Sequence, residues 1–453
     1  MLPWTQNRWC RCRTWTRAFA PAAIVWAAWC SRGYGDDADA TPSAATCASV
    51  ESQAVVGVPG GLSDLALPRG GAGRLWATTD RGPNGTVNIG GKKVRTLLQP
   101  GFAPEIMEME LPGEAADPAA RVVRTIPLSG RSGSPLSGRP NGVGRDEPIL
   151  DADGGPPLPG DPNGVDTEGL VQMADGSFWM VEEYRPSLLH VSAEGRMLAR
   201  YVPEGTKLDG ADAEVLDVLP AAYALRRDNR GFESLAVSPS GTRLWTMLQS
   251  PLDNGKSKTV NKAGNVRLLA FDPVACRPVA EHVYRLGDPA DADYPAKGAA
   301  PSDGKLCALA AIDDDSLLVI EQDDKSVVRL YRIDLAAATD TLPRRPNRKE
   351  PTLEEIRDLE ASGIVPVEKT LVADLAPLVA TMRRDVYGDA GASKDAPLKL
   401  EGMAILGPDR VAIVNDNDYG VNVKPGATCR SCLWVIRLPA SLSAEISDLP
   451  RAD

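Results

Sequence analysis

The chain has 453 residues and a net charge of −11, and 42 residues are glycine and 38 are proline. Such acidity disfavours nucleic acid and anionic membranes as partners, and favours cations or anions held through a bound cation. The sequence has two histidines, so a His-rich metal site and a double-His mechanism are also disfavoured. The abundance of turn-forming residues suits many short strands better than helices.

The N-terminus has the pattern of an export signal. Residues 1–33 carry five arginines and no acid, and an apolar run extends from Ala18 to Trp29. This run is too short to span a bilayer comfortably, so we expect export to the periplasm or the exterior, with an uncleaved anchor as the alternative. Cys30 suggests a lipid anchor, but Trp29 stands where a small residue is needed. We predict that residues 1–45 are signal and flexible spacer.

Strand signals begin after Cys47. Residues 49–58 (SVESQAVVGV) form a candidate strand, which we expect to pair with the last repeat and close the array. The first repeat starts at Gly60, with inner strands in GGLSDLAL and RLWATTDRG and outer strands in EIMEMELP and RVVRTIPL. Residues 130–165 lack periodicity, which predicts a long loop, and residues 441–453 read as a polar tail.

Three later stretches share one pattern of acid, apolar strand, turn, second apolar strand and polar cluster. They are DTEGLVQMADGSFWMVEEY from Asp166, GFESLAVSPSGTRLWTMLQS from Gly231 and KLEGMAILGPDRVAIVNDND from Lys399. A further repeat starts at Lys305 and is followed by helix candidates at 351–360 and 374–388. Because such a unit cannot bury its apolar face alone, it must stack on copies of itself.

We therefore predict an all-β fold. It is a single β-propeller over residues 47–440, with five blades and a short helical insertion. Six blades are the alternative, with a weak blade hidden in 100–165 or 203–230. Five cysteines lie beyond the leader, an odd number, and their pairing is open: Cys47, Cys276, Cys307, Cys429 and Cys432. The CxxC at 429–432 predicts a tight local disulfide, because no second ligand pair completes a zinc site.

Polar side chains recur at both ends of each repeat. Alignment of the first strands places at one position Ser63, Glu168, Glu233, Cys307 and Glu401. The ends of the second strands carry Asp80, Glu182 and Glu183, Gln249, Glu321 with Asp323 and Asp324, and the run Asn415 to Asp418. In a hairpin, the start of the first strand and the end of the second lie at the same edge. Both sets should meet at one mouth of the central channel.

Carboxylates gathered in one concavity must be protonated, paired or bound to a cation. Oxygen ligands of this kind suit Ca²⁺, with Mg²⁺ as an alternative. We predict cation ligands at Glu168, Glu233, Glu321, Glu401, Asp80, Asn415, Asp416 and Asp418. A water held by the cation or by Glu182 or Glu183 would attack, and Arg81 or Arg185 would clamp a substrate oxygen. The structural alternative is that these acids cap backbone N–H groups or pair with arginines.

Several of these segments, in order, resemble the bacterial phytase-like family, described by its esterase-like activity of phytase. They are GGLSDLAL…LWATTDRGPNG, DPNGVDTEGLVQMADGSFWMVEEYRPS, NRGFESLAVSPSGTRLWTMLQSPL and LEGMAILGPDRVAIVNDND. The resemblance covers roughly residues 55–438 and implies an exported propeller that hydrolyses phosphoesters or esters. It assigns activity to recurring acids, which here are Glu168, Glu182, Glu183, Glu233, Glu401, Asp416 and Asp418. Cys307 departs from this pattern, because it stands where an acid is expected.

Other catalytic signatures are missing from the sequence. There is no GxSxG elbow and no P-loop, and His190 and His282 fall on predicted outer strands. We expect a monomeric, divalent-metal-dependent hydrolase that takes a small anionic or ester substrate through its cation. The alternative is a non-catalytic propeller that binds a ligand or partner on the same face around structural calcium. Lactone or other ester chemistry at a central calcium is a third reading.

Overall fold

The computed structural model describes residues 48–58, 60–69, 73–111, 119–144, 146–253, 264–287, 304–323, 327–344, 352–393, 396–421, 423 and 427–442. The chain divides into residues 1–42 and 43–453, and every described residue belongs to the second unit. The predicted export signal, Cys30, Cys47, Asp324 and nearly all of the polar tail lie outside the described residues. Within the described part of the chain, no helix has the length and hydropathy of a membrane span.

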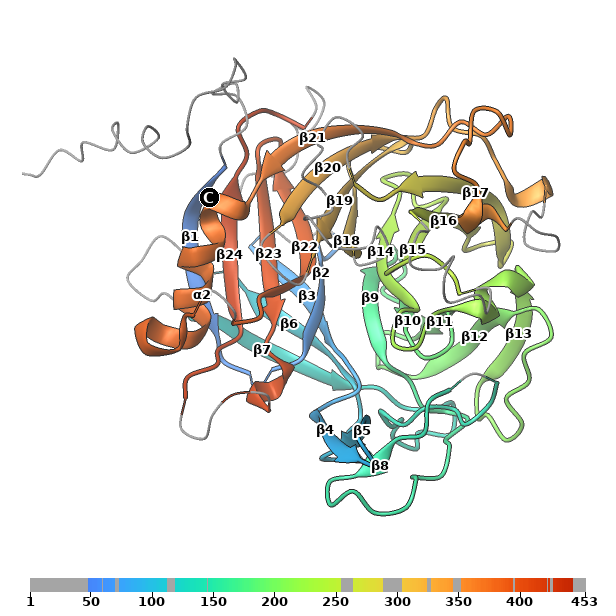
Figure 1. The fold of residues 1–453 in the computed structure, drawn as a ribbon, viewed down its shortest axis with the longest axis vertical. Coiled ribbons are helices and arrows are strands. Elements are labelled where there is room, and N and C mark those ends of the chain that lie inside the picture. The colour runs from blue at the N-terminus through green and yellow to red at the C-terminus, as the bar shows by residue number, and fades with distance from the viewer. Residues whose placement is uncertain are drawn as a thin grey trace, which may run out of the picture. The chain divides into compact units, whose positions relative to one another are not determined.

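The strands form sets that follow one another along the chain (Figure 1). The first set is β2 (Leu62–Ala66), β3 (Arg74–Thr79), β6 (Glu105–Glu110) and β7 (Ala119–Pro127). The second is β9 (Thr167–Gln172), β10 (Phe178–Glu182), β11 (Ser187–Val191), β12 (Met197–Pro203) and β13 (Glu214–Leu219). The third is β14 (Phe232–Val237), β15 (Leu244–Leu248), β16 (Asn265–Asp272) and β17 (Arg277–Arg285). The fourth is β18 (Lys305–Ala311), β19 (Ser316–Gln322), β20 (Val328–Asp334) and β21 (Glu368–Asp374).

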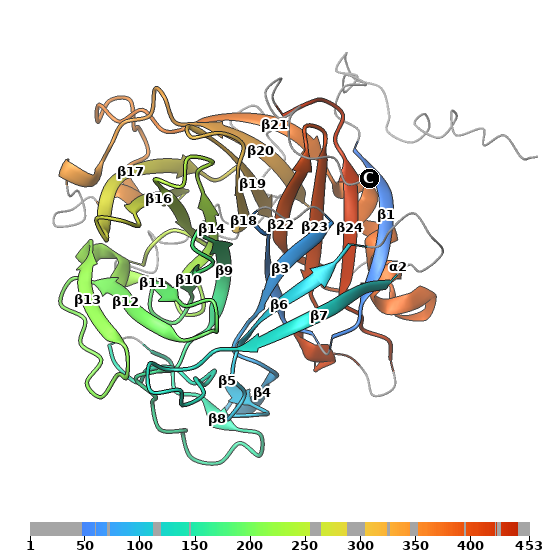
Figure 2. The same cartoon turned by 180° about the vertical axis from the view of Figure 1, so that it is seen from behind.

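The last set combines both ends of the described chain. It contains β22 (Lys399–Gly407), β23 (Arg410–Asp416), β24 (Cys432–Arg437) and β1 (Ser49–Val56). β1 pairs antiparallel with β24, with Val55 opposite Cys432, and Figure 2 shows the two strands side by side. β1 also pairs parallel with β7 at two positions, which joins the first and last sets into one eight-stranded sheet. The N-terminal strand thus covers the edge of the last set, as the sequence predicted.

The innermost strands β2, β9, β14, β18 and β22 contact one another in cyclic order. This gives the nearly closed, propeller-like arrangement that the repeats predicted, with antiparallel pairing inside the repeats. β13 pairs parallel with β12 and so extends the second set, without starting a new one in the 203–230 region. The shared geometry brings the equivalent end of every repeat to the same region.

The described chain contains one α-helix, the kinked α2 (Ala376–Gly391), close to the predicted 374–388. The helix predicted over 351–360 is wrong. Only a 3-10 turn, η6 (Leu353–Glu355), forms there. The side-chain amide of Asn265 donates hydrogen bonds to the carbonyl oxygens of Leu353 and Ile356, which a continuing helix would use for its own hydrogen bonds. The other short 3-10 turns are η2 (Ala221–Leu225), η4 (Leu342–Arg344) and η7 (Asp418–Gly420).

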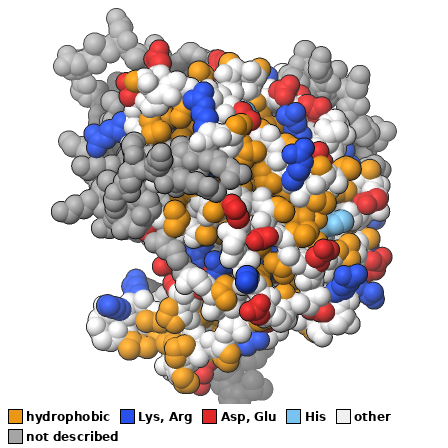
Figure 3. Space-filling view, turned by 90° about the vertical axis from the view of Figure 1, so that its right-hand side faces the viewer, with side chains coloured by type: hydrophobic (Ala, Val, Ile, Leu, Met, Phe, Trp, Pro, Cys, Tyr) orange, Lys and Arg blue, Asp and Glu red, His pale blue; other side chains and the backbone are white. Residues whose placement is uncertain are grey.

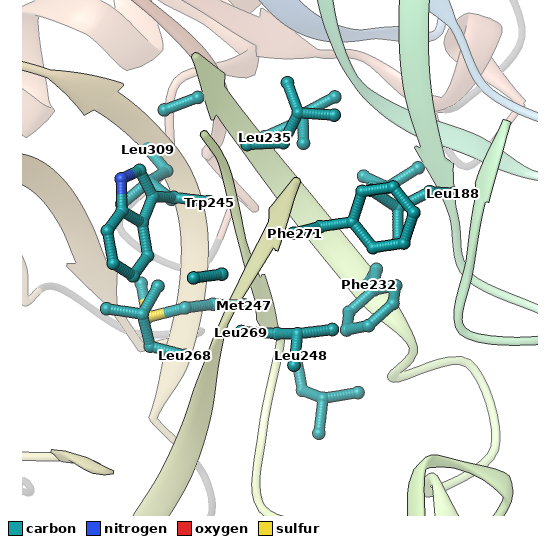
Figure 4. Close-up of a cluster of buried hydrophobic side chains, with 14 of the residues drawn as sticks. Leu188, Phe232, Leu235, Trp245, Met247, Leu248, Leu268, Leu269, Phe271 and Leu309 are labelled. Atoms are coloured by element: carbon teal, nitrogen blue, oxygen red, sulfur yellow. The ribbon is translucent and has the colours of Figure 1, made fainter. Parts of the chain in front are cut away.

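The core lies between neighbouring sets, because each sheet buries both faces against the next. Figure 4 shows one cluster in which Leu188 of β11, Phe232 of β14 and Leu309 of β18 join Trp245 and Phe271. Each large apolar side chain buried in this way stabilises the fold by roughly 1.5–3 kcal/mol. On the face in Figure 3, acidic and basic side chains are interspersed with apolar ones.

A small sheet inserted into the first set was missed in the sequence. β4 (Asn84–Ile89), β5 (Lys92–Leu97) and β8 (Leu150–Asp151) form it, and β8 lies in the region predicted as loop. The β4–β5 turn uses Gly90 and Gly91, with φ of 59° and 82°, a conformation that favours glycine. This hairpin supplies one wall of the channel mouth.

Candidate functional site

A β-bulge recurs in all five innermost strands at the position where the repeats carry their first polar residue. The strand register shifts across Ser63, Glu168, Glu233, Cys307 and Glu401, one residue in each strand. A bulge leaves one residue unpaired and re-aims its side chain. Glu168, Glu233 and Glu401 thereby line one pocket, although they are far apart in sequence.

This pocket has a volume of about 370 Å³ and a lining that is almost entirely polar. Its acids are Asp80, Glu168, Glu183, Asp228, Glu233, Glu401, Asp416 and Asp418. Its bases are Arg81, Arg95, Arg230, Lys305 and Lys399. A cavity with this lining fits a small, charged or highly polar ligand better than an apolar one.

The densest group of carboxylates lies beside Arg81. Asp166, Glu168 and Glu183 are all buried, and each offers an oxygen within 4.8 Å of the others. One oxygen of Asp166 accepts the backbone N–H of Arg81 at 3.0 Å, and the other is ion-paired with the Arg81 guanidinium. Glu183 Oε2 pairs with the same guanidinium at 2.9 Å. Asp166 therefore anchors Arg81, while Glu168 and Glu183 keep oxygens for a ligand.

Buried oxygens without partners identify where a cation fits. The side chains of Glu183 and Glu233 are each only 2 % exposed. Among the described residues, Glu183 Oε1 and Glu233 Oε2 are buried oxygens that have no hydrogen-bond partner. Leaving a buried carboxylate oxygen unsatisfied is costly. A hard divalent cation held by several carboxylates, together with a water bound to it, would satisfy both oxygens. This buried acidic cluster could therefore bind a metal ion.

Burial raises the pKa of several carboxyl groups in and beside the pocket. Burial, followed by the charges of Asp166 and Glu233, raises the pKa of Glu168 well above its usual value. Burial likewise raises the pKa of Asp166 to about 7, of Glu401 to about 8 and of Asp416 to about 6. The charged forms are disfavoured because low-dielectric surroundings and like charges act together. A bound cation would reverse that preference and release protons.

The opposite wall of the pocket carries its own cation. Lys399 Nζ lies 2.8 Å from Asp416 Oδ2 and 2.6 Å from Asp418 Oδ1. Burial alone would lower the pKa of Lys399, but the charges of Asp416, Glu401 and Asp418 outweigh it and raise the pKa. Burial, followed by the negative charge of Asp416, raises the pKa of Asp80 well above its usual value. The mouth is thus acidic overall, with a lysine between two of its acids.

Four residues predicted for the site lie outside the pocket lining. Glu182 accepts the backbone N–H groups of Tyr184 and Arg185, and Arg185 pairs with Asp146 at 2.9 Å. Glu321 accepts the Gly287 N–H at 2.6 Å and pairs with Lys369, and Asn415 accepts the Cys432 N–H at 2.7 Å. These side chains cap turns or fill buried ion pairs, as the structural alternative held. The pocket lining thus brings together eight of the twelve predicted residues and does not include Glu182, Arg185, Glu321 or Asn415.

The sequence interpretation also missed Asp166 of the buried acidic cluster and several residues of the pocket lining. Asp166 precedes Glu168 by two positions, the spacing that places side chains on the same face of a strand, so a signal was present. Lys305 and Lys399 each precede a bulged residue by two positions in the same way. Arg95 and Asn229 come from the inserted hairpin and a loop, and no repeat pattern marked them.

The cysteines and histidines that the structure describes do not contribute to the pocket lining. Cys276, Cys307, Cys429 and Cys432 are free thiols, so the predicted local disulfide at 429–432 is not formed. Burial raises the pKa of Cys307 well above its usual value, which keeps that thiol protonated beside the acids. The His190 ring stacks on Trp179, with the ring centroids 4.8 Å apart.

Comparisons with known proteins agree with the sequence pattern. A family model described as "Phytase-like: Esterase-like activity of phytase" matches residues 59–419. An "Uncharacterized secreted protein" of Arthroderma benhamiae is 27 % identical over 247 residues, which are 47 % of this chain and 46 % of that relative. The aligned part is therefore about half of the relative's length.

Solved structures give only weak superpositions. A putative oxidoreductase (glucose dehydrogenase) from Thermus thermophilus is 15 % identical, with a TM-score of 0.33, over 86 % of this chain and 100 % of that one. The PQQ-bound aldose sugar dehydrogenase of Streptomyces coelicolor is 12 % identical, with a TM-score of 0.31, over 86 % and 98 %. At these TM-scores the likeness supports no inference about function.

Proposed function

This chain belongs to the phytase-like family, and we propose that it is an exported, divalent-cation-dependent hydrolase of phosphoesters or other esters. The observation that carries the proposal is the pair of buried, unpartnered oxygens, Glu183 Oε1 and Glu233 Oε2, in a pocket lined by acids from several repeats. The secreted relative and the arginine-bearing N-terminus support export.

We propose Ca²⁺ as the cation, with Mg²⁺ as the alternative. Calcium takes six to eight oxygen ligands in flexible geometry, which suits a site built from carboxylates on separate strands. Glu168 and Glu233 would hold it on one side of the mouth, and Asp80, Glu401, Asp416 and Asp418 are the further acids within the same pocket. When bound, the cation would polarise a phosphoryl or carbonyl oxygen and offset developing negative charge.

The remaining residues would act on the substrate and on water. Arg81 is 4 % exposed, and its Nε and Nη1 have no hydrogen-bond partner among the described residues, so the guanidinium has two donors that could bind an anionic oxygen. Asp166 and Asn229 hold that guanidinium in place. Glu183 offers a carboxylate oxygen within 4.8 Å of a Glu168 oxygen, and it would accept the proton of an attacking water.

We also propose five blades for the propeller over residues 47–440. The support is the cyclic order of contacts among β2, β9, β14, β18 and β22, with one β-bulge in each. Each blade would then contribute one bulged side chain to the mouth. Light scattering of the purified mature protein would test the accompanying expectation of a monomer.

Hydrolysis of p-nitrophenyl phosphate with and without a chelator tests the function. We expect turnover that EDTA removes and added Ca²⁺ restores, and that Glu233→Gln loses while the exposed control Glu214→Gln keeps it. Turnover that ignores the chelator would contradict the cation dependence. If Ca²⁺ raises the unfolding temperature and no phosphoester, carboxylic ester or lactone is cleaved, the protein is instead a non-catalytic binding propeller.

A further inference from the structure

The segment that presents Asp416 and Asp418 has an unusual backbone. Asp418 and Tyr419 both adopt left-handed conformations, with φ of 47° and 52°. For a residue with a side chain this conformation is disfavoured, because the Cβ lies too close to the following carbonyl oxygen. Two consecutive residues hold it only where their surroundings determine it, and such positions cluster at functional sites. The surroundings of Tyr419 are therefore informative.

One side of the Tyr419 ring rests against the chain before β2. A Cβ added to Gly61 would lie 2.2 Å from Tyr419 Cε2, and one added to Gly60 would lie 2.0 Å from Asn417 Oδ1. Only glycine allows this approach. Asn417 Oδ1 also accepts the N–H groups of Gly61 at 3.3 Å and Tyr419 at 3.1 Å. The turn that follows β23 is thus fastened to the start of the first set.

The ring also meets the segment that follows β3. Phe102 packs edge-on against Tyr419, with ring centroids 5.6 Å apart and an interplanar angle of 75°. Phe102 in turn covers Gly82, where an added Cβ would lie 2.5 Å from Phe102 Cδ1. Gly82 donates its N–H to Asp80 Oδ1 at 2.8 Å. A continuous contact path therefore runs from Tyr419 to Asp80.

These contacts join two arms of the mouth. One arm carries Asp416 and Asp418, and Asp418 donates its N–H to Asp416 Oδ1 at 2.8 Å. The other arm carries Asp80, and the two arms come from opposite ends of the chain. Tyr419 itself does not line the pocket.

We propose that Tyr419 is a positioning residue that sets the separation of Asp80 from Asp416 and Asp418. It acts as a wedge between the Gly60–Gly61 segment and Phe102, and it touches neither cation nor substrate. The inference rests on the proposed function in one respect, namely that these acids help to bind the cation. Substitution of residues that orient metal ligands without binding the metal themselves typically weakens metal affinity by about 10–100-fold.

The test compares three variants of the full chain. Tyr419→Gly suits the left-handed backbone but removes the ring, Tyr419→Phe keeps the ring, and Phe271→Leu disturbs a core aromatic residue outside the pocket lining. Calorimetric titration with CaCl₂ should give a Kd raised about tenfold or more in Tyr419→Gly and a Kd near that of the wild type in the other two. Hydrogen exchange in EDTA should increase in residues 79–84 and 414–421 of Tyr419→Gly alone.

The two measurements separate the inference from the proposed function. Equal Ca²⁺ affinity in Tyr419→Gly and the wild type would overturn the wedge, and so would a loss of affinity of the same size in Phe271→Leu. If the wild type binds no Ca²⁺, the proposed cation fails and hydrogen exchange decides the wedge. Faster exchange in both segments then supports it, and unchanged exchange overturns it.

Discussion

Glu182→Gln should strongly destabilise the protein, whereas Glu183→Gln should leave stability nearly unchanged and remove activity. The two residues are adjacent acids, both almost fully buried. Glu182 accepts four hydrogen bonds, from Tyr184 N, Arg185 N, Ser187 Oγ and Arg200 Nη2, at 2.9, 2.9, 2.8 and 2.5 Å. Glu183 instead pairs with Arg81 through Oε2, and its Oε1 is buried without a hydrogen-bond partner.

The magnitude follows from what each change leaves behind. Arg200 is 1 % exposed, and its other partners are neutral: Ser187 Oγ, the Gly164 carbonyl and Asn141 Oδ1. Glu182→Gln therefore leaves the buried Arg200 guanidinium without a charged partner, which lowers the free energy of unfolding by about 3–5 kcal/mol. After Glu183→Gln, Arg81 keeps its ion pair with Asp166 and the amide can still accept a hydrogen bond. We expect a change within about 1 kcal/mol, since one repelling charge is also removed.

Urea unfolding in EDTA, followed by fluorescence, measures both stabilities, and p-nitrophenyl phosphate turnover measures activity. The reasoning predicts an unstable Glu182→Gln protein and a stable, inactive Glu183→Gln protein. Equal stability of Glu182→Gln and the wild type would refute the buried-pair argument. Full activity in Glu183→Gln would remove the proposed base.

Three further outcomes are expected. In EDTA, the free energy of unfolding should fall as the pH rises from about 5 to 8. The folded-state pKa values of Asp166, Glu401 and Asp416 are raised, so their contribution to stability is complete below the unfolded pKa values near 4 and disappears as the pH passes about 6 to 8. A stability that does not change with pH would contradict these pKa values. Ca²⁺ should raise the unfolding temperature in the wild type and much less in Glu233→Gln, with an equal rise in both counting against Glu233 as a ligand. Gly231→Ala should cost about 1–3 kcal/mol and lower activity, because its Cβ would lie 2.0 Å from the Glu183 carbonyl, and wild-type stability and turnover would show that this packing is looser than described.

The first polar position of each repeat was predictable because its geometry repeats. The same bulge occurs at Glu168, Glu233 and Glu401, so alignment of the sequence repeats also aligns the side chains in space. The closing strand β1 was predictable for a related reason, since an array of sheets needs its last edge covered. Both the repeats and the closing strand can be recognised from sequence patterns that extend over the length of a single strand.

The second polar position was only partly predictable. A strand end followed by a tight turn needs an oxygen to accept backbone N–H groups, and a catalytic site also needs a carboxylate there. Glu182 and Asn415 meet the first need, while Glu183 and Asp416 line the pocket, yet neighbouring residues of the same type look alike in sequence. The inserted β4–β5 hairpin was missed despite Gly90–Gly91, a turn signal between two strand-like runs.

The central claim is that acids from distant parts of the chain bind one cation in the pocket. The most direct test is an anomalous difference map from a crystal soaked in TbCl₃, because Tb³⁺ substitutes for Ca²⁺. We predict a peak in the pocket within about 2.3–2.6 Å of carboxylate oxygens from Glu168 and Glu233. A map with no peak there, or with peaks only at exposed carboxylates elsewhere, would contradict the account.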